Sequence, residues 1–338
     1  MKHYLSLTLT AATAVLFLGC SSKQYFTPEQ TYSASKAERS FGSTIVDLSR
    51  DGATLSNGHY IGKNGISNID LGEGYRFLSE NENYVLAGNP EGVLKIIEKR
   101  SGEPVRAVAL HVPIVSAKID RGIIAYVLNN NTFGIYQIAD NRKVMENRSE
   151  RTYAIDTRAA TPMFVDSLAV MPMLDGKLII VDGRNPENAK VVYISSAKYF
   201  NNVIFLARLG DAMVAATPKK VIVLGNGGKK EYAANISEVA VSKAGIYLFT
   251  KEGEVIRLDL GLRPIAKKKF KFAHFSAATA FGDRVYALDQ QGSLIVLSSD
   301  LGKYKIYDVG VVDEPAFITG TKLYKDGRVI ELSQLGYE

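Results

Sequence analysis

The chain has 338 residues, and its 41 lysine and arginine residues against 35 aspartate and glutamate residues leave a formal net charge of +6. This mild positive excess is compatible with anionic neighbours but identifies none of them. The chain has a single cysteine, which excludes an internal disulfide, and it has no tryptophan.

Residues 1–19 are expected to be an export signal. Lys2 supplies positive charge, an apolar run follows from residue 5 to residue 18, and Gly19-Cys20 comes directly after it. The run is too short to span a bilayer comfortably. Residues 16–20, Leu-Phe-Leu-Gly-Cys, resemble the lipobox of bacterial lipoproteins, although Phe17 departs from the small aliphatic residue usual there. The resemblance implies lipidation of Cys20, and the alternative is an ordinary secretory signal.

Residues 20–42 are expected to form the lipidated N-terminus and a flexible tether. They are polar, rich in Ser, Lys, Ala and Glu, and show no strong period. Such a composition is typical of segments that let a folded body stand off a surface. Ser21, directly after the cysteine, implies sorting to the outer membrane by analogy with enteric lipoproteins.

From residue 43 onward a short hairpin pattern recurs along the chain. Each copy has an apolar run, a polar turn that usually contains glycine, and a second apolar run, most clearly at residues 284–297. The turns recur roughly every 35 to 45 residues, a period typical of stacked supersecondary units. Other copies lie at residues 84–97, 123–136, 168–181, 212–224, 246–258 and 322–332.

These repeats predict an all-β fold, a single β-propeller of four-stranded blades over residues 43–338. Complete blades are expected near residues 75–110, 113–157, 158–199, 200–236, 237–275 and 276–312. The C-terminal piece, residues 316–332, has only about three strands, so the N-terminal segment 44–71 is expected to complete it and close the ring. That pairing of N- and C-terminal strands predicts seven blades. Eight is the alternative, because Asp51-Gly52 and Asn64-Gly65 could turn a separate hairpin.

The repeats also resemble a known propeller type. Residues 93–105 are similar to the quinoprotein-like (PQQ-type) repeat, and residues 255–263 and 294–304 are weaker copies. Because this chain has no tryptophan, the tryptophan docking contacts of that family must be absent here or replaced by residues such as Tyr304. With a lipobox in front, the chain resembles the BamB-type propeller lipoproteins, accessory subunits of the outer-membrane β-barrel assembly machinery.

The sequence offers no convincing catalytic centre. A quinone-dependent dehydrogenase would need tryptophan against the cofactor and a calcium-binding set of carboxylates, and neither pattern is found. No two of His3, His59, His111 and His274 lie close enough in sequence to make a local metal pair. His111 and His274 are expected to be partly buried and bonded to backbone. We therefore predict no enzyme activity, no catalytic residue, no metal and no cofactor.

One basic stretch is a candidate contact for an anionic surface. Residues 267–272 read Lys-Lys-Lys-Phe-Lys-Phe, and alternation in a strand would place Lys269 and Lys271 opposite Phe270 and Phe272. The functional interpretation is that Lys267, Lys268, Lys269 and Lys271 meet phospholipid, lipopolysaccharide or an acidic partner. The structural alternative is an outer strand whose lysines discourage edge pairing.

The resulting hypothesis is a non-enzymatic periplasmic scaffold, lipid-anchored at the outer membrane. Its expected partner is an envelope protein complex, first of all β-barrel assembly subunits, while nucleic acid is not expected. The alternatives are a structural subunit of another envelope machine, such as a secretion or flagellar apparatus, and a propeller that binds a small molecule or glycan. A fold-level resemblance alone decides none of these.

Overall fold

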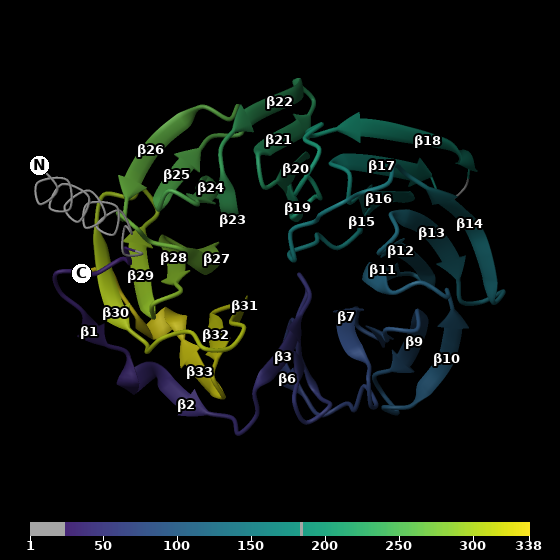
Figure 1. Cartoon of the computed structure of the whole chain (residues 1–338), viewed down its shortest axis with the longest axis horizontal. Helices are drawn as coiled ribbons and strands as arrows, with labels where there is room; N and C mark the ends of the chain where they lie inside the picture. Colours follow the sequence, from purple (N-terminus) through teal and green to yellow (C-terminus); the bar gives the residue numbers. More distant parts are fainter. Residues whose placement is uncertain (1–23, 183–184) are drawn as a thin grey trace, which may run out of the picture.

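The computed structural model describes residues 24–182 and 185–338, which form a closed ring of eight β-sheets (Figure 1). The predicted signal segment and Cys20 lie outside the described residues. Each sheet is one blade, with its first strand at the centre of the ring and its last strand at the rim. The all-β propeller prediction is confirmed.

The blades are numbered here in chain order. Blade 1 contains β3 (Ile45–Leu48), β4 (Ala53–Leu55), β5 (Tyr60–Gly62) and β6 (Gly65–Ser67); blade 2 contains β7 (Arg76–Glu80), β8 (Tyr84–Gly88), β9 (Val93–Glu98) and β10 (Pro104–Ala109). Blade 3 contains β11 (Ile114–Asp120), β12 (Ile123–Leu128), β13 (Thr132–Gln137) and β14 (Arg142–Arg148); blade 4 contains β15 (Met163–Val165), β16 (Leu168–Pro172), β17 (Lys177–Asp182) and β18 (Asn185–Tyr193). Blade 5 contains β19 (Phe205–Leu209), β20 (Ala212–Thr217), β21 (Lys220–Gly225) and β22 (Gly228–Ala233); blade 6 contains β23 (Ile236–Ser242), β24 (Gly245–Thr250), β25 (Glu254–Leu258) and β26 (Pro264–Lys269). Blade 7 contains β27 (Phe275–Phe281), β28 (Arg284–Asp289), β29 (Ser293–Ser298) and β30 (Tyr304–Asp308); blade 8 contains β31 (Phe317–Thr319), β32 (Lys322–Lys325), β33 (Arg328–Glu331) and β2 (Glu38–Ser40).

The expected count of seven blades is wrong, and the alternative of eight is confirmed. The segment expected to complete the C-terminal blade, residues 44–71, instead folds into blade 1. Its strands have only three or four residues, so each carries a weak alternation signal. The turns at Asp51-Gly52 and Asn64-Gly65 were the sequence features that favoured this outcome.

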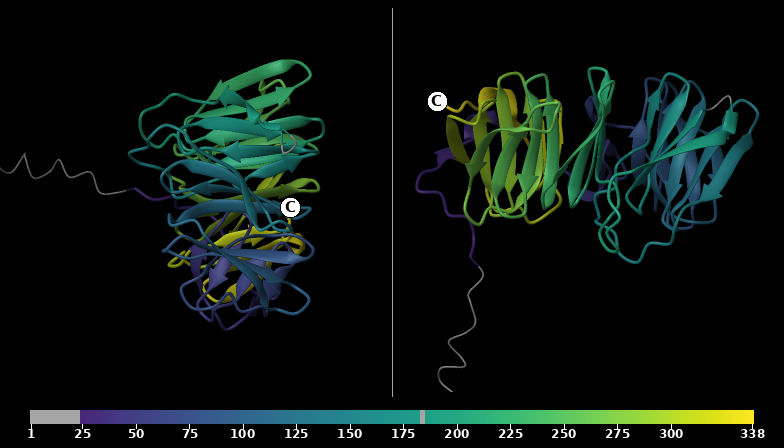
Figure 2. Two further views of the ribbon diagram at one scale, coloured as in Figure 1. Left: turned by 90° about the vertical axis from the view of Figure 1, so that its right-hand side faces the viewer. Right: turned by 90° about the horizontal axis from the view of Figure 1, so that it is seen from above.

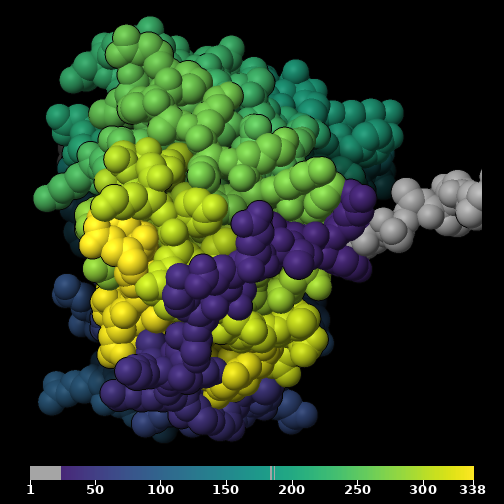
Figure 3. Space-filling view, turned by 90° about the vertical axis from the view of Figure 1, so that its left-hand side faces the viewer, coloured from purple at the N-terminus to yellow at the C-terminus, as the bar shows by residue number. Residues whose placement is uncertain are grey.

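The ring is closed by the N-terminal segment, as predicted, but by a different part of it. Strand β2 pairs antiparallel with β33, with Glu38 opposite Ile330 and Ser40 opposite Arg328. Just before it, β1 (Tyr32–Ser33) adds a fifth, parallel strand to the rim of blade 7, and the 3₁₀ helix η1 (Ser35–Ala37) connects the two. Figure 3 shows this segment lying across blades 7 and 8. Part of the stretch expected to be a tether is therefore packed on the propeller.

Apolar side chains fill the space between adjacent blades. Between blades 6 and 7, for example, Tyr247 and Phe249 pack in one cluster with Val285 and Ile295, and all four are fully buried. The strand pattern of the hairpins places these side chains on both faces of a blade, because each blade is covered by a neighbour on either side. The repeated apolar runs are thus inter-blade core.

Because neighbouring strands run antiparallel, the connections fall on two opposite faces of the ring. The turn between the second and third strands of a blade and the connection to the next blade lie on one face, which we call the loop face. The remaining turns lie on the other face, which we call the turn face. The two 3₁₀ helices, η1 and η2 (Leu332–Gln334), are short, and no helix in the described part of the chain could span a membrane.

Candidate functional site

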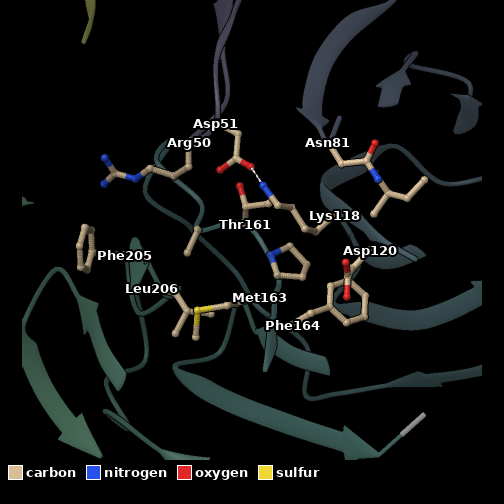
Figure 4. A pocket seen from close by; sticks show the side chains of 13 residues that line it. Arg50, Asp51, Asn81, Lys118, Asp120, Thr161, Met163, Phe164, Phe205 and Leu206 are labelled. Atoms are coloured by element: carbon tan, nitrogen blue, oxygen red, sulfur yellow. Dashed lines mark hydrogen bonds and ion pairs between the residues drawn. The ribbon is translucent and has the colours of Figure 1, made fainter. Parts of the chain in front are cut away.

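The central channel is where a propeller would hold a ligand or a catalytic group, so its contents bear directly on function. The turn of residues 49–52, between β3 and β4, projects into the middle of the ring (Figure 1). Its two side chains Arg50 and Asp51 point in different directions across the channel (Figure 4). Blade 1 therefore fills part of the space that the other inner strands enclose.

Arg50 links blade 1 to blade 6 and to the connection that precedes blade 5. Its Nε donates to the carbonyl oxygen of Ile204 at 2.7 Å, and its Nη1 lies 2.8 Å from Oε2 of Glu238 on β23. The Glu238 side chain is only 5% exposed, and a buried carboxylate is costly to the fold unless cations and hydrogen bonds compensate it. Arg158 supplies a second one, with Nη1 at 3.4 Å from Oε1 of Glu238.

Arg158 in turn holds Asp156 in a forked contact. Nη2 and Nε of Arg158 lie 2.6 and 2.8 Å from the two carboxylate oxygens of Asp156. Burial acts to raise the pKa of Asp156, but the hydrogen bonds and charge of Arg158 outweigh it, so the pKa is lowered. Burial likewise acts to lower the pKa of Arg158, and its two carboxylate neighbours raise it above its ordinary value. Arg50, Glu238, Arg158 and Asp156 thus form one network of ion pairs.

On the other side of the turn, Asp51 pairs with Lys118 of β11. Beside this pair lies a pocket of about 500 Å³, whose walls also include Asp120, Phe164 of β15 and Phe205 of β19 (Figure 4). Its lining therefore contains two kinds of side chain: charged groups that form ion pairs, and aromatic rings. Within this lining, Asp51 pairs with Lys118, and Asp120 pairs with the exposed Arg121 beside the pocket.

The histidines do not contribute a site. His111 and His274 are both exposed, not partly buried as expected, and they lie on connections between different blades. Within residues 24–182 and 185–338, no group of three His, Cys, Asp or Glu side chains could hold a metal ion. The charged side chains described in the central channel pair with one another.

A second candidate lies on the loop face, where two long connections stand side by side. We call residues 149–162, between β14 and β15, and residues 194–204, between β18 and β19, the loop platform. They extend further from the ring than the neighbouring connections (Figure 2). The fully buried Asn202 joins them: its Oδ1 accepts from the Asp156 amide at 2.7 Å, and its Nδ2 donates to the Asp156 and Arg158 carbonyls at 3.1 and 3.2 Å.

Further contacts make the platform a single body. The Phe200 amide donates to the Ala154 carbonyl at 3.0 Å, and the Ala160 amide donates to the Val203 carbonyl at 2.9 Å. Since Asp156 also belongs to the ion-pair network, the platform is joined directly to the central channel. Its backbone is therefore held in place from beneath.

The outer surface of the platform is aromatic and cationic. Tyr153 is 68% exposed, and Tyr199 and Phe200 are each 51% exposed. The rings of Tyr153 and Tyr199 contact each other edge to face with centroids 6.4 Å apart. Arg151 lies over Tyr153 at 5.9 Å, and Lys198 lies over Tyr199 at 5.3 Å. Large exposed aromatic rings beside cations are typical of surfaces that bind something.

The basic stretch lies at the rim of blade 6, at the end of its outer strand. Strand β26 ends at Lys269, and Lys267, Lys269 and Lys271 are exposed, while Lys268 is half-buried with its ammonium 4.5 Å from the ring centroid of Tyr304. Phe270 is buried, as alternation predicts. Phe272 is not, because the strand has ended and its φ of +68° turns the ring outward, where it is 36% exposed.

Tyr304, proposed from the sequence as a replacement for tryptophan, makes aromatic contacts between blades. It stands at the start of β30 in blade 7 and contacts Phe270 of the preceding connection edge to face, with ring centroids 5.3 Å apart. Phe270 also contacts Phe26 of the N-terminal segment, at 5.9 Å. Aromatic contacts thus join blades 6 and 7 to that segment.

Sequence reasoning did not find the platform or the Arg50 network. The sequence did carry one signal for the platform, the adjacent pair Tyr199-Phe200 within the polar run of residues 195–202. Two neighbouring aromatic residues in a polar segment do not fit the buried face of a strand, so they indicate an exposed binding surface. The ion pairs had no comparable signal, because Arg50 and Glu238 are far apart in sequence and meet only through ring closure.

No protein-family model matches the chain. Two curated relatives, the plasminogen-binding protein PgbB of Helicobacter pylori strains J99 and 26695, are each 25% identical over 357 residues. The matches cover 92% of this chain and 66% of the relatives, so the chain spans just under two thirds of their length.

Several solved propellers have the same fold. BamB from Moraxella catarrhalis matches with a TM-score of 0.66 at 13% identity, over 86% of this chain and 98% of BamB. The computationally designed protein Ika8 matches with a TM-score of 0.64 at 13% identity, over 86% of this chain and 96% of the design. Sqt1 from Saccharomyces cerevisiae matches with a TM-score of 0.61 at 13% identity, over 91% and 97% of the two chains. The chain therefore has a BamB-like propeller fold, as its repeats predict.

Proposed function

We propose that this chain is a non-enzymatic, protein-binding propeller, anchored in a bacterial envelope membrane by lipid on Cys20. It would act as an accessory or scaffold subunit of an envelope complex. The observation that carries the proposal is the closed ring whose central charges, Arg50, Glu238, Arg158, Asp51 and Lys118, pair with one another. Such a frame is rigid and leaves its outer surfaces for binding.

Outer-membrane protein assembly is the first candidate process, with subunits of the β-barrel assembly machinery as partners. The BamB-like fold supports it, together with the lipobox-like residues 16–20. The relatives carry the name of plasminogen-binding proteins, which supports protein binding as the general activity. A secretion or flagellar apparatus in the envelope is the alternative setting.

Copurification tests the partner directly. The tagged full-length chain would be crosslinked in its native cells and purified, and the proposal expects subunits of an envelope complex in the eluate. Recovery of barrel-assembly subunits would support the first candidate, and recovery of secretion or flagellar subunits would replace it. Recovery of neither would count against a scaffold role.

The anchor has its own test. Cys20→Ser removes the only thiol in the chain, and it is expected to release the protein from the membrane fraction, because a bound acyl chain contributes about 0.8 kcal/mol per buried methylene. Cys20→Ser protein that stays in the membrane fraction would show that lipid on Cys20 is not the anchor.

A ligand-binding function is the second candidate, because aromatic rings and carboxylates meet in the central pocket. Phe164 and Phe205 line it together with Asp51 and Asp120. A pocket of about 500 Å³ has the size of small-molecule sites. A thermal-shift screen with glycans, calcium and quinones would test it, with Phe205→Ala as the comparison variant. A stabilising compound whose effect requires Phe205 would favour this function over the scaffold.

A further inference from the structure

The exposed aromatic side chains of the connections are confined to one face of the ring. Tyr153, Tyr199 and Phe200 of the platform, and Phe272 between blades 6 and 7, all lie in connections on the loop face. Among the described residues, no exposed aromatic ring lies within the turns of the opposite face, where Leu260 is 49% exposed; Tyr304, 43% exposed, directly follows one of these turns but packs against Phe270. The two faces therefore differ in chemistry.

Cations accompany three of these rings. Arg151 lies 5.9 Å from the ring centroid of Tyr153, Lys198 lies 5.3 Å from that of Tyr199, and Lys271 lies 4.8 Å from that of Phe272. Amphipathic rings with adjacent lysine or arginine are typical of groups that lie at a lipid–water interface, where the ring enters the head-group layer and the cation meets phosphate.

The described chain also begins on this face. Figure 2 shows that the N-terminal segment (purple) reaches the edge of the ring on the same side as the platform (teal). In Figure 3 the segment runs along the rim toward that side. Phe26 packs against Phe270 of the connection between blades 6 and 7, and residues 26–30 line a hollow at the rim together with Lys269, Lys271, Tyr304 and Tyr337.

The distance from this point to the anchor is short. Six residue steps separate Cys20 from Phe26, so even a fully extended chain reaches only about 20 Å. A freely swinging tether through residue 42, as the sequence suggests, is excluded because β1 and β2 are paired with blades 7 and 8. Lipid on Cys20 would thus hold the loop-face edge of the propeller close to the bilayer.

From these observations we propose that the loop face rests against the membrane that holds the anchor. Tyr153, Tyr199 and Phe200 enter the head-group layer, and Arg151, Lys198 and Lys271 contact lipid phosphate. The turn face then points away from the membrane and is the face open to soluble partners. This inference deepens the proposed function, because it assumes the anchor at Cys20 and assigns the orientation that the anchor produces.

The absence of tryptophan allows a direct test. Tyr199→Trp places one fluorophore on the platform, and Leu260→Trp places one on the turn face, at sites 51% and 49% exposed respectively. Each variant, as the chain from Cys20 to the C-terminus, would be coupled through its single thiol to maleimide-bearing lipid. The vesicles would contain phosphatidylethanolamine, a minor share of phosphatidylglycerol, and brominated phosphatidylcholine as the quencher.

We expect the bromine atoms to quench the emission of the Tyr199→Trp variant about twofold, since an interfacial indole lies at head-group depth. The Leu260→Trp variant should keep its emission. Arg151→Gln with Lys198→Gln, added to Tyr199→Trp, should weaken the quenching on vesicles with phosphatidylglycerol. Equal quenching at both positions, or quenching of Leu260→Trp alone, would overturn the orientation.

The design separates this inference from the proposed function. In the vesicle experiment, chemical coupling supplies the anchor whether or not the cell lipidates Cys20. If the Cys20→Ser protein stays in the membrane fraction of cells, that result refutes only the natural lipid anchor and leaves the vesicle experiment valid. If Tyr199→Trp is unquenched on vesicles but shifts its emission when a barrel-assembly subunit is added, the loop face is a protein-binding face. That result would overturn the membrane contact and leave the scaffold function standing.

Discussion

Arg50 and Glu238 lie in blades 1 and 6, which are not neighbours in the ring, yet their side chains pair at 2.8 Å across the central channel. Glu238 also forms an ion pair with Arg158. Arg158 pairs with Asp156, whose amide donates a hydrogen bond to the buried Asn202 of the loop platform. One chain of contacts therefore links the first blade, the channel and the exposed aromatic surface.

Loss of Arg50 should destabilise the propeller. Arg50→Met keeps much of the side-chain volume. It leaves the buried Glu238, 5% exposed, with Arg158 as its one cationic partner. It also removes the hydrogen bond that the Ile204 carbonyl accepts from Arg50. We expect the free energy of unfolding in urea to fall by about 2 kcal/mol. Lys303→Met is the control, because it removes an ion pair between two exposed side chains, Lys303 (67% exposed) and Glu338 (75% exposed). It should change the free energy of unfolding by less than about 0.5 kcal/mol. Equal effects of the two variants would contradict a structural role for the channel pairs.

The pKa of Asp156 predicts a dependence of stability on acid. Because the folded-state pKa lies below the ordinary value of 3.8, the carboxylate stabilises the fold above that pH, and this contribution is lost as the pH falls through the folded pKa. Asp156→Asn should therefore destabilise the protein at neutral pH, and the difference from the parent should shrink below about pH 4. Urea unfolding at several pH values would measure it.

Asp211→Asn is the control for this experiment. Its side chain is 89% exposed in the turn between β19 and β20, so the substitution should have little effect at any pH. A difference between Asp156→Asn and the parent that stays constant down to low pH would argue against the buried ion pair.

The glycine of the repeated hairpin turn should be required by geometry. Gly292 has a φ of +89°, and a Cβ there would overlap the carbonyl of Gly310 on the next connection. Gly292→Ala is expected to lower the free energy of unfolding by about 3 kcal/mol, from strain and overlap together. Gly210→Ala, with a φ of +62° and open space around it, should cost about 1 kcal/mol. Thermal unfolding of both variants would test this: a larger loss of stability for Gly292→Ala than for Gly210→Ala is expected if the contact with the Gly310 carbonyl excludes a Cβ at position 292.

Ring closure can be tested by a disulfide. Ser40 and Arg328 are paired directly across β2 and β33, and opposite residues in antiparallel strands have Cα atoms about 4.5 to 5.5 Å apart, within disulfide range. In a Cys20→Ser background, Ser40→Cys with Arg328→Cys should crosslink under mild oxidation, as seen by mass spectrometry of the digest. Folded protein that forms no such crosslink would show that another segment closes blade 8.

Local patterns in the sequence were enough to predict most blades. Runs such as Val285 to Leu288 and Leu294 to Leu297 are fully buried, because each blade face meets another blade, and the turn between them contains a glycine of positive φ. The short strands of blade 1 did not carry enough alternation to show that they form a complete sheet. The strand that closes the ring, Glu38–Ser40, has a polar sequence that resembles a linker.

By itself the sequence determined the repeating hairpin, the propeller class and the lipobox-like segment, because these depend on residues close together in the chain. Only the tertiary structure decided the number of blades, the strand that closes the ring and the contacts of Arg50 with Glu238. It also brought Phe26 of the N-terminal segment against Phe270, and Tyr153 against Tyr199. These relationships join residues far apart in sequence, and they arise only when the ring closes and brings the blades together.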